Sequence, residues 1–205
     1  MKIIAFNGSA RKQGNTQMML DIVFEALNKA GVDTEVIQLR GTHLQGCSAC
    51  MQCFENRDKR CVLKGDDLNE WIARVDQADG LILASPTYFG NVSAEMKALI
   101  DRLGLVSFAN PGLLRYKAGA AVAVCRRIGS KSALNAMNAI FFTSQMFIAC
   151  SNYANMAIGM MPGDVMQDAM GQETMRILGQ NMAKLLRATA HLKHEVIDEQ
   201  AQGEV

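Results

Sequence analysis

The sequence lacks several features that would assign a protein to a class at once. Its 21 lysines and arginines and 20 aspartates and glutamates leave a formal net charge of only +1. So small a charge gives no electrostatic attraction to nucleic acid or to an acidic membrane surface. No apolar run reaches the ~18 residues of a membrane-spanning helix, and the N-terminus does not have the pattern of a signal peptide. We therefore expect a cytoplasmic protein with no nucleic-acid or membrane partner.

Internal repeats and linkers are also missing, so residues 1–205 are expected to form one domain. Hydrophobic residues make up 49% of the chain and charged residues 20%, which is typical of a soluble globular protein. The length is sufficient for a proper hydrophobic core. In the cytoplasm, the six cysteines are expected to be thiols, metal ligands or redox groups and not structural disulfides.

The apolar pattern alternates between the periods of strands and helices along the whole chain. Strands are expected at 2–6, 32–39, 80–84, 118–125 and 146–150. Helices are expected at 16–30, 66–77, 93–103, 130–145 and 171–193, with a loop at 152–170. This order predicts an α/β three-layer sandwich, a five-stranded parallel sheet with helices on both faces. Five strands that begin with a polar loop favour the flavodoxin-like order 2-1-3-4-5, whose ligands lie beyond the carboxyl ends of the first and third strands.

The polar loop after the first strand lacks the motifs of two large nucleotide-binding classes. No Lys-Ser/Thr pair follows Gly14, as a Walker loop requires, and the Gly-x-Gly-x-x-Gly spacing is absent. The loop instead offers hydroxyls, an amide and a cation at a helix N-terminus, where free N–H groups and the helix dipole attract anions. This set of donors suits a terminal phosphate. The alternative interpretation is that the segment is an ordinary surface loop that binds no ligand. The candidate residues are Ser9, Arg11, Gly14, Asn15 and Thr16.

A second irregular loop follows the third strand at 85–91 and lands beside the first. Pro86 stiffens it, and Gly90 permits a turn or a close backbone approach. Two adjacent aromatic residues stand where a surface loop is normally polar, so a flat heteroaromatic ring could pack there. The alternative is that both rings cover the sheet end or an interface. The candidate residues are Pro86, Thr87, Tyr88, Phe89, Gly90 and Asn91.

Four of the six cysteines lie in a cysteine-rich insertion at about 41–65. Three thiolates at two-residue gaps can surround one corner of a cubane cluster, and a fourth can close it from a short loop. Structural zinc usually prefers two separated cysteine pairs, and free thiols are a further alternative. Lys59 and Arg60 would offset part of a cluster's negative charge. The candidate metal ligands are Cys47, Cys50, Cys53 and Cys61.

Taken together, the two loops resemble the NADPH-dependent FMN reductase family of flavodoxin-like proteins. The resemblance is carried by residues 8–16, 85–102, 162–165 and 178–182, and it extends over essentially the whole chain. It implies that the first loop holds the FMN phosphate and that the second lies against the isoalloxazine ring. The segment 125–129 resembles a third ring-contacting segment, which adds Arg126, Arg127 and Gly129. A cation there would favour anionic reduced flavin or a cosubstrate phosphate, and a solvated arginine pair is the alternative.

The cysteine spacing resembles that of the iron–sulfur flavoproteins, a branch of this family that binds one [4Fe–4S] cluster near FMN. The resemblance implies an FMN-dependent oxidoreductase with NAD(P)H as cosubstrate. A nicotinamide or a redox protein would donate electrons, and a small molecule or a protein would accept them. No side chain stands out as an acid or base, so none is named as catalytic. The rival is a non-enzymatic electron carrier, or a redox sensor whose cysteine loop is the switch.

Fourteen methionines are many for this length, and nine of them lie between 137 and 182. Together with neighbouring phenylalanines, they predict that the helices at 130–145 and 171–193 help to form a homodimer or homotetramer. Cys125 and Cys150 fall on expected strands and are predicted to be buried, and Trp71 is predicted to lie in the core.

Overall fold

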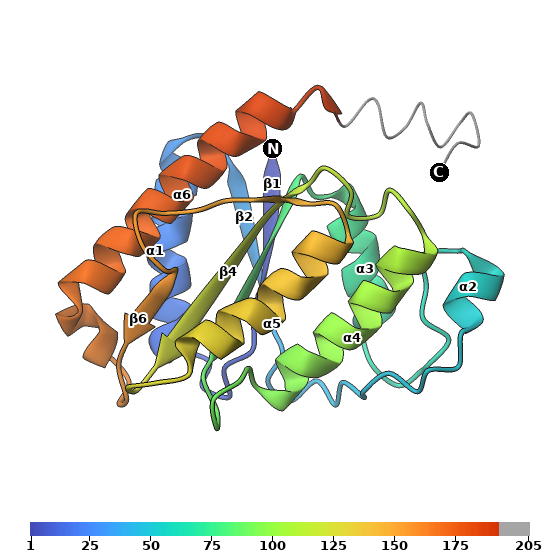
Figure 1. Ribbon diagram of the computed structural model, residues 1–205, viewed down its shortest axis with the longest axis horizontal. Coiled ribbons are helices and arrows are strands. Elements are labelled where there is room, and N and C mark those ends of the chain that lie inside the picture. The colour runs from blue at the N-terminus through green and yellow to red at the C-terminus, as the bar shows by residue number, and fades with distance from the viewer. Residues whose placement is uncertain (193–205) are drawn as a thin grey trace.

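The computed structural model describes residues 1–192, and its centre is a parallel sheet in the order β2-β1-β3-β4-β5 (Figure 1). The strands are β1 Lys2–Asn7, β2 Asp33–Gln38, β3 Gly80–Pro86, β4 Ala118–Cys125, β5 Phe147–Ile148 and β6 Met156–Ile158. Nearly every residue of β1, β3 and β4 is buried, because helices cover both faces of the sheet. The flavodoxin-like class and the strand order are therefore confirmed.

The fifth position of the sheet differs from the single strand expected at 146–150. Two short strands share it: β5 pairs with the beginning of β4, and β6 pairs with its end. β6 lies inside 152–170, which the sequence predicted to be loop. The intervening residues are mostly polar and cannot continue a buried strand, so the chain leaves the sheet and returns. Cys150 is consequently exposed and not buried, whereas Cys125 is buried as predicted.

The helices form two layers, with α1 and α6 on one face of the sheet and α3, α4 and α5 on the other (Figure 1). They are α1 Asn15–Lys29, α2 Gln52–Asn56, α3 Leu68–Gln77, α4 Ala94–Ala109, α5 Ser130–Thr143 and α6 Ala169–Thr189, with a 3-10 turn η1 at Asp164–Gln167. Neither α2 nor η1 was expected. α6 ends before the predicted limit at Lys193, which lies outside the described residues. Within residues 1–192, no helix is long and apolar enough to span a membrane.

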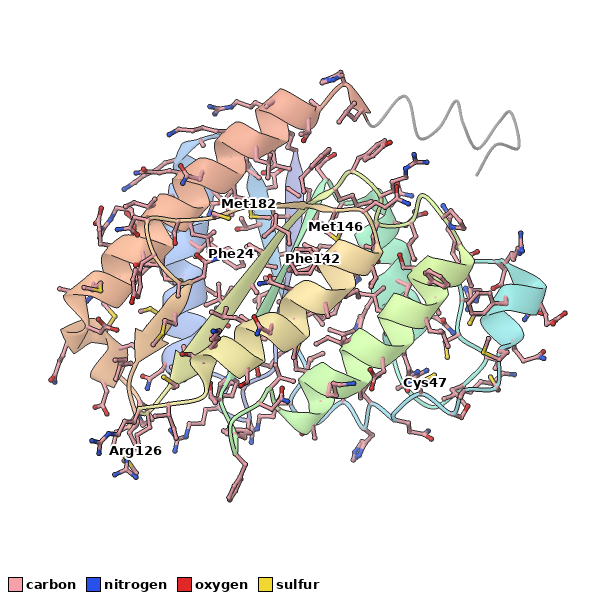
Figure 2. The ribbon with its side chains drawn as sticks, viewed as in Figure 1. Phe24, Cys47, Arg126, Phe142, Met146 and Met182 are labelled. Carbon is pink, nitrogen blue, oxygen red and sulfur yellow. The ribbon has the colours of Figure 1, made fainter. Side chains whose placement is uncertain are left out.

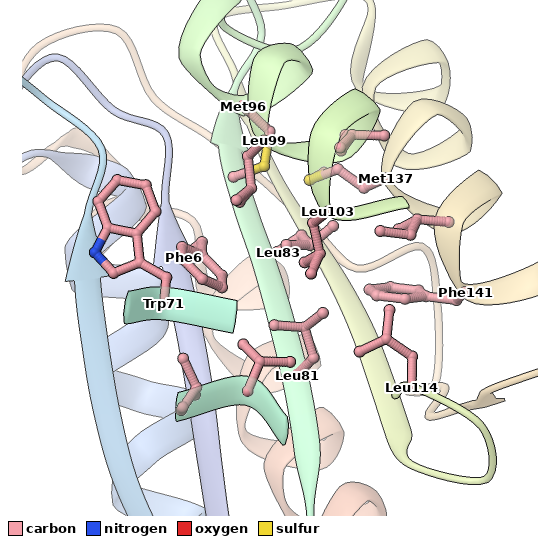
Figure 3. Close-up of a cluster of buried hydrophobic side chains, with 14 of the residues drawn as sticks. Phe6, Trp71, Leu81, Leu83, Met96, Leu99, Leu103, Leu114, Met137 and Phe141 are labelled. Carbon is pink, nitrogen blue, oxygen red and sulfur yellow. The ribbon is translucent and has the colours of Figure 1, made fainter. Parts of the chain in front are cut away.

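The core on the α3–α5 face is built from aliphatic, aromatic and methionine side chains (Figure 3). Trp71 is 5% exposed and meets Phe6 edge-on with 5.9 Å between ring centroids, so its predicted core role is confirmed. Met137 of α5 and Met182 of α6 are 0% exposed, and they therefore stabilise this chain and are not free to face a second copy. The oligomer itself stays a prediction. The exposed methionines are Met1, Met51, Met160, Met161, Met166 and Met170.

The starts of α3 and α4 show how local sequence positions the parts of the site. Ser93 caps α4, because its Oγ accepts a hydrogen bond from the Met96 N–H at 3.3 Å. At α3 the residue before the helix is Asp67, and its side chain makes no capping hydrogen bond. The structure uses Asp66, whose Oδ1 accepts from the Leu68 N–H at 3.2 Å. The other carboxylate oxygen of Asp66 remains available for a partner on α4.

Candidate cofactor site

The carboxyl ends of β1, β3 and β4 meet at one edge of the sheet, the lower edge in Figure 1. Backbone hydrogen bonds continue past the strand ends and join the loops that follow. The Gly8 N–H donates to the Ala84 carbonyl at 2.8 Å, and the Thr87 N–H donates to the Val124 carbonyl at 2.7 Å. The structure therefore brings together the three loops that the sequence singled out.

Two glycines permit the closest contacts between these loops. Gly129 has a φ of +92°, and a Cβ there would lie 2.7 Å from Thr87 Cγ2 and 2.8 Å from Gly90 Cα. A Cβ on Gly8 would lie 2.8 Å from Ser93 Oγ. A side chain at either position would push two loops apart, so both positions favour glycine. The Arg126–Gly129 loop thus packs directly on the 85–91 loop.

The first loop presents backbone donors at the N-terminus of α1. Ser9, Asn15 and Thr16 are buried, and Ser9 Oγ accepts a hydrogen bond from the Arg11 N–H at 3.1 Å. Among the described residues, the N–H groups of Asn15, Thr16 and Gln17 have no acceptor. Free N–H groups at the positive end of a helix are the donors that a phosphate requires. The backbone therefore fits a terminal phosphate.

Side chains of the first loop are already engaged with a distant segment. Arg11 Nη1 donates to the Met160 carbonyl at 3.1 Å. The Asn15 amide donates to the Met161 carbonyl at 2.9 Å and accepts from the Gly163 N–H at 2.8 Å. Asn15 thus fixes the 160–163 segment with its side chain and offers an anion only its N–H. The exposed Arg11 has freedom to turn. Sequence reasoning gave this segment no role beyond its family resemblance.

The second loop is a tight turn with its rings turned outward. Tyr88 and Asn91 exchange backbone hydrogen bonds of 2.8 and 3.1 Å, and Phe89 stands at the tip with a φ of +46°. Phe89 is fully exposed and Tyr88 is 45% exposed. Thr87 Oγ1 is buried without a hydrogen-bond partner. A buried polar atom left without a partner requires an explanation, and a bound heterocycle beside this loop would supply one.

The third loop is more solvated than the other two. Arg126 and Arg127 are exposed, and Ile128 is 79% exposed. Arg126 lies at the lower edge of the molecule, at the end of β4 (Figure 2). Gly129 of this loop packs closely on the second loop. The exposure of Arg126 and Arg127 is compatible with both interpretations of the arginine pair, a cofactor contact and a solvated pair.

The cysteine segment lies at the same edge, on the side of α4 (Figure 2). Cys47 and Cys50 are exposed, Cys53 is buried and Cys61 is half-buried. All four line one cavity of about 20 Å³, which has room for a single water. A four-iron cluster would require the exposed Cys47–Cys50 turn to move outward. No three His, Cys, Asp or Glu side chains of residues 1–192 are placed to share one metal ion.

The chemistry of the four cysteines, and not the size of the cavity, is what matches a cubane cluster. Each iron of the cubane takes one thiolate, so the four sulfurs stay apart and do not converge on one point. The four cysteines supply that number of donors, and none of them is in a disulfide. Zinc needs its four ligands around one centre. The donor set therefore fits the cluster in number and kind, and zinc would require these sulfurs to converge on one centre, which residues 1–192 do not show.

Side chains, and not the sheet, hold the cysteine segment in place. Phe54 meets Phe108 of α4 edge-on at 6.0 Å, and the Lys59 N–H donates to Asn110 Oδ1 at 3.1 Å. The segment itself is irregular. Its non-glycine residues with positive φ are His43, Ala49, Met51, Arg57 and Lys59. Such conformations store strain and persist only where surrounding contacts enforce them.

Cys61 is the most firmly fixed of the four cysteines. Its N–H donates to Asn69 Oδ1 at 2.7 Å, and its carbonyl accepts from Asn69 Nδ2 at 2.8 Å. Its sulfur accepts from Arg102 Nη2 at 3.3 Å. A cysteine whose backbone and sulfur are both held by hydrogen bonds is positioned before any metal binds.

Sequence reasoning missed Arg102. It is 1% exposed and its Nη1 forms an ion pair with Asp66. Burial lowers the pKa of Arg102, but hydrogen bonds to Asp66 and Cys61 outweigh burial and raise the pKa above its usual value. A signal was present in the sequence, because this arginine interrupts the apolar stripe of α4.

Neither of the two cations expected to offset the cluster's charge has a described side-chain contact with a cysteine. Lys59 Nζ forms an ion pair with Asp76 at 3.1 Å, and Arg60 is exposed without a described contact to a cysteine. Both were singled out because they are neighbours of Cys61 in sequence. A side chain next in sequence can point away from its neighbour, whereas Arg102 reaches Cys61 across 41 residues.

The thiols differ in how readily they ionise. The Gln52 N–H lowers the pKa of Cys50 by hydrogen bonding to the thiolate. Burial raises the pKa of Cys53 and that of Cys125. The exposed turn of the segment therefore holds a reactive thiol, and the buried positions hold less reactive ones.

Two further hollows lie outside these contacts. A groove of about 550 Å³ runs between residues 41–46 and the first turns of α4. A cavity of about 260 Å³ lies at the opposite edge of the sheet, where Met1, Tyr116 and Leu186 line it. The groove adjoins the candidate cofactor edge, and the cavity does not.

The sheet order and the loops at its carboxyl edge define a flavodoxin-like protein, and solved structures agree. One is a flavodoxin from the domain Archaea, with a TM-score of 0.59, 18% identity and coverage of 91% of this chain and 99% of the other. Another is the NAD(P)H:quinone oxidoreductase of Methanothermobacter marburgensis, with a TM-score of 0.61, 14% identity and coverage of 89% and 98%. Identities this low show the fold alone.

The chain belongs to the NADPH-dependent FMN reductase family, whose model matches residues 1–160. An iron–sulfur flavoprotein of Methanocaldococcus jannaschii is 34% identical over 194 residues, which cover 91% of this chain and 98% of the relative. An iron–sulfur flavoprotein of Methanosarcina thermophila is 28% identical over 188 residues, covering 91% and 95%. The predicted family and branch are confirmed, and the class is that of an FMN-dependent oxidoreductase.

Proposed function

We propose that this protein is an NAD(P)H-dependent flavin oxidoreductase that binds FMN and one [4Fe–4S] cluster. The observation that carries the proposal is the position of α4. The first turn of α4 follows the second loop and packs against Gly8. Residues in the middle of α4 line the cavity that all four candidate cluster cysteines share. One rigid helix thus joins the two candidate cofactor sites, and relatives named iron–sulfur flavoprotein support both.

The residues of the sheet edge would bind and orient FMN. The free N–H groups at the start of α1 would hold its phosphate, with Arg11 as a charged partner. The buried Thr87 hydroxyl would find its missing partner on the ring, and Tyr88 and Phe89 would flank it. Bound FMN supplies the capacity to accept two electrons as hydride and to release them singly.

The electron donor would reach the flavin from solvent. The chain has no dinucleotide fingerprint, so a nicotinamide would stack on the exposed flavin, transfer hydride and leave. Cys47, Cys50, Cys53 and Cys61 would hold a cluster that connects the flavin to one-electron redox proteins. A small molecule or a protein would be the acceptor. We further propose a cytoplasmic location and a homodimer or homotetramer.

The test begins with protein purified without air. We expect FMN at about one per chain, broad absorption beneath the flavin bands, and iron with acid-labile sulfide. Steady-state oxidation of NADH and NADPH is then measured with a quinone, oxygen or free FMN as acceptor. A spectrum with two sharp flavin bands and no iron would contradict the proposed cluster. The absence of turnover with every donor would contradict the proposed reductase activity.

A specific observation favours the rival role of a redox sensor or carrier. Cys47 and Cys50 are exposed, and the pKa of Cys50 is lowered by the Gln52 N–H. Such a thiol responds readily to oxidants. Bound FMN without turnover, together with reversible oxidation of these thiols, would support this alternative.

A further inference from the structure

The buried cation beneath the cysteine segment lies outside the three loops proposed to hold FMN. We propose that Arg102 is a positioning residue that presents the Cys61 sulfur to the cluster and raises the cluster's reduction potential. The inference rests on the proposed function, because it requires that the four cysteines hold a cluster. It adds the residue of this chain that sets the electronic properties of that cluster.

Both terminal nitrogens of Arg102 donate to groups of the cysteine segment and its flanks, whereas its Nε is buried without a partner. Nη1 forms an ion pair with Asp66 and donates to the Gln45 carbonyl at 3.3 Å. Nη2 donates to Cys61 Sγ at 3.3 Å and to the Leu63 carbonyl at 3.5 Å. The guanidinium therefore organises residues before and after the cysteines, and its planar fork allows it to do so from one position.

Burial makes this charge effective. The side chains of Arg102 and Asp66 are 0% and 1% exposed, so water does not screen them. Reduction of the cluster by one electron adds one negative charge beside the guanidinium. A nearby positive charge and a hydrogen bond to a ligating sulfur both stabilise the reduced form. Asp66 opposes this effect, because its carboxylate repels the added electron.

The ion pair therefore predicts changes of opposite sign. In Arg102→Gln the equilibrium constant for cluster reduction should fall at least tenfold, which is about 59 mV for one electron. In Asp66→Asn it should rise, because the arginine then acts without its counter-charge. Arg102→Lys keeps the charge but not the fork and should lie between wild type and Arg102→Gln. If the contact between Arg102 and Asp66 were purely structural, replacing the two residues would not shift the reduction potential in opposite directions.

The experiment is a dithionite titration of anaerobic full-length protein, in which dithionite supplies the electron and electron paramagnetic resonance measures the reduced cluster. Iron and sulfide are measured first in every variant. Arg74→Gln, on α3, is the matched control, since Arg74 pairs with Glu35 and Glu70 and is half-exposed. It should leave the potential unchanged.

The outcomes separate this inference from the proposed function. Wild-type protein without iron would overturn both. A wild-type cluster whose potential is unchanged in Arg102→Gln, or changed equally in Arg74→Gln, would overturn only the role of Arg102. If the Arg102→Gln protein fails to hold a cluster, the reduction potential of the Asp66→Asn variant tests the inference in its place. A potential at or below that of wild type in Asp66→Asn would overturn the inference, and a higher potential would support it.

Discussion

The flavin loops and the cysteine segment lie at the same edge of the molecule but are held there by different means. The loops after β1, β3 and β4 are fixed by parallel strand pairing and by backbone hydrogen bonds such as that from Thr87 to Val124. The cysteine segment has no strand, and a few side chains fix it on α4. The first region is determined by topology, and the second by individual contacts.

This difference determines how each region responds to mutation. Strand pairing distributes the stabilisation of the flavin loops over many backbone groups, so the loss of one side-chain contact changes it little. The cysteine segment depends on Asn69, Arg102 and Asp66, and the loss of one buried partner costs several kcal/mol, roughly 3–5 for a buried ion pair. We therefore expect the two cofactors to be separable by mutation.

The largest expected effect is the loss of the cluster alone. In Cys61→Ser, iron in anaerobic protein should fall from about four per chain to below one, while bound FMN stays unchanged. The serine hydroxyl is a poor ligand for iron, and the flavin loops do not touch Cys61. Iron and flavin analyses of the same sample measure both.

Cys150→Ser is the matched control, because Cys150 is exposed and lies outside the cysteine cavity. It should keep both cofactors. Loss of FMN together with iron in Cys61→Ser would show that the two regions are not independent.

A smaller effect is expected at the contact between the second and third loops. Gly129→Ala would place a Cβ 2.7 Å from Thr87 Cγ2, and FMN binding should weaken about tenfold, or ~1.4 kcal/mol. Flavin fluorescence during titration of FMN-free protein measures the dissociation constant. Iron content should not change.

Gly31→Ala separates crowding from backbone strain. Gly31 also has a positive φ, of +76°, but a Cβ there would meet nothing within 4 Å. Both variants should lose about 1–3 kcal/mol of unfolding free energy from strain. Equal weakening of FMN binding in both would contradict the loop contact.

The smallest effect is expected away from both regions. Glu35 of β2 accepts from Lys2 at 2.6 Å and from Arg74 at 2.8 Å, and the hydrogen bond from Lys2 holds the pKa of Glu35 below its ordinary value. A lowered folded pKa stabilises the protein above the unfolded value of about 4.3, and this contribution is lost as pH falls through the folded pKa. Glu35→Gln should cost under ~1 kcal/mol at pH 7, because the pair is partly exposed.

Urea unfolding of both proteins at pH 7 and at lower pH measures this contribution. The difference between wild type and Glu35→Gln should shrink as pH falls, and both cofactors should stay bound at pH 7. A difference that grows toward low pH would contradict the assigned sign.

Regular elements could be predicted from the sequence because their signals are local. The apolar runs of β1 and β3 depend on neighbouring residues, and both strands were found in the structure. The split of the fifth strand was not predicted. The polar residues between β5 and β6 show only where the chain leaves the sheet, whereas its return as β6 depends on which part of β4 is free to pair.

The sequence by itself determined the fold, the three loops at one sheet edge, and the chemistry of four cysteines at short spacing. Only the tertiary structure decided which charge lies beside them: Arg102 and not the adjacent Lys59 or Arg60. It also decided that Asn15 fixes residues 160–163 with its side chain. The physical reason is that strand and helix patterns arise from neighbours in sequence. A buried charge, by contrast, takes its partners from whichever segments the packing brings within hydrogen-bond distance.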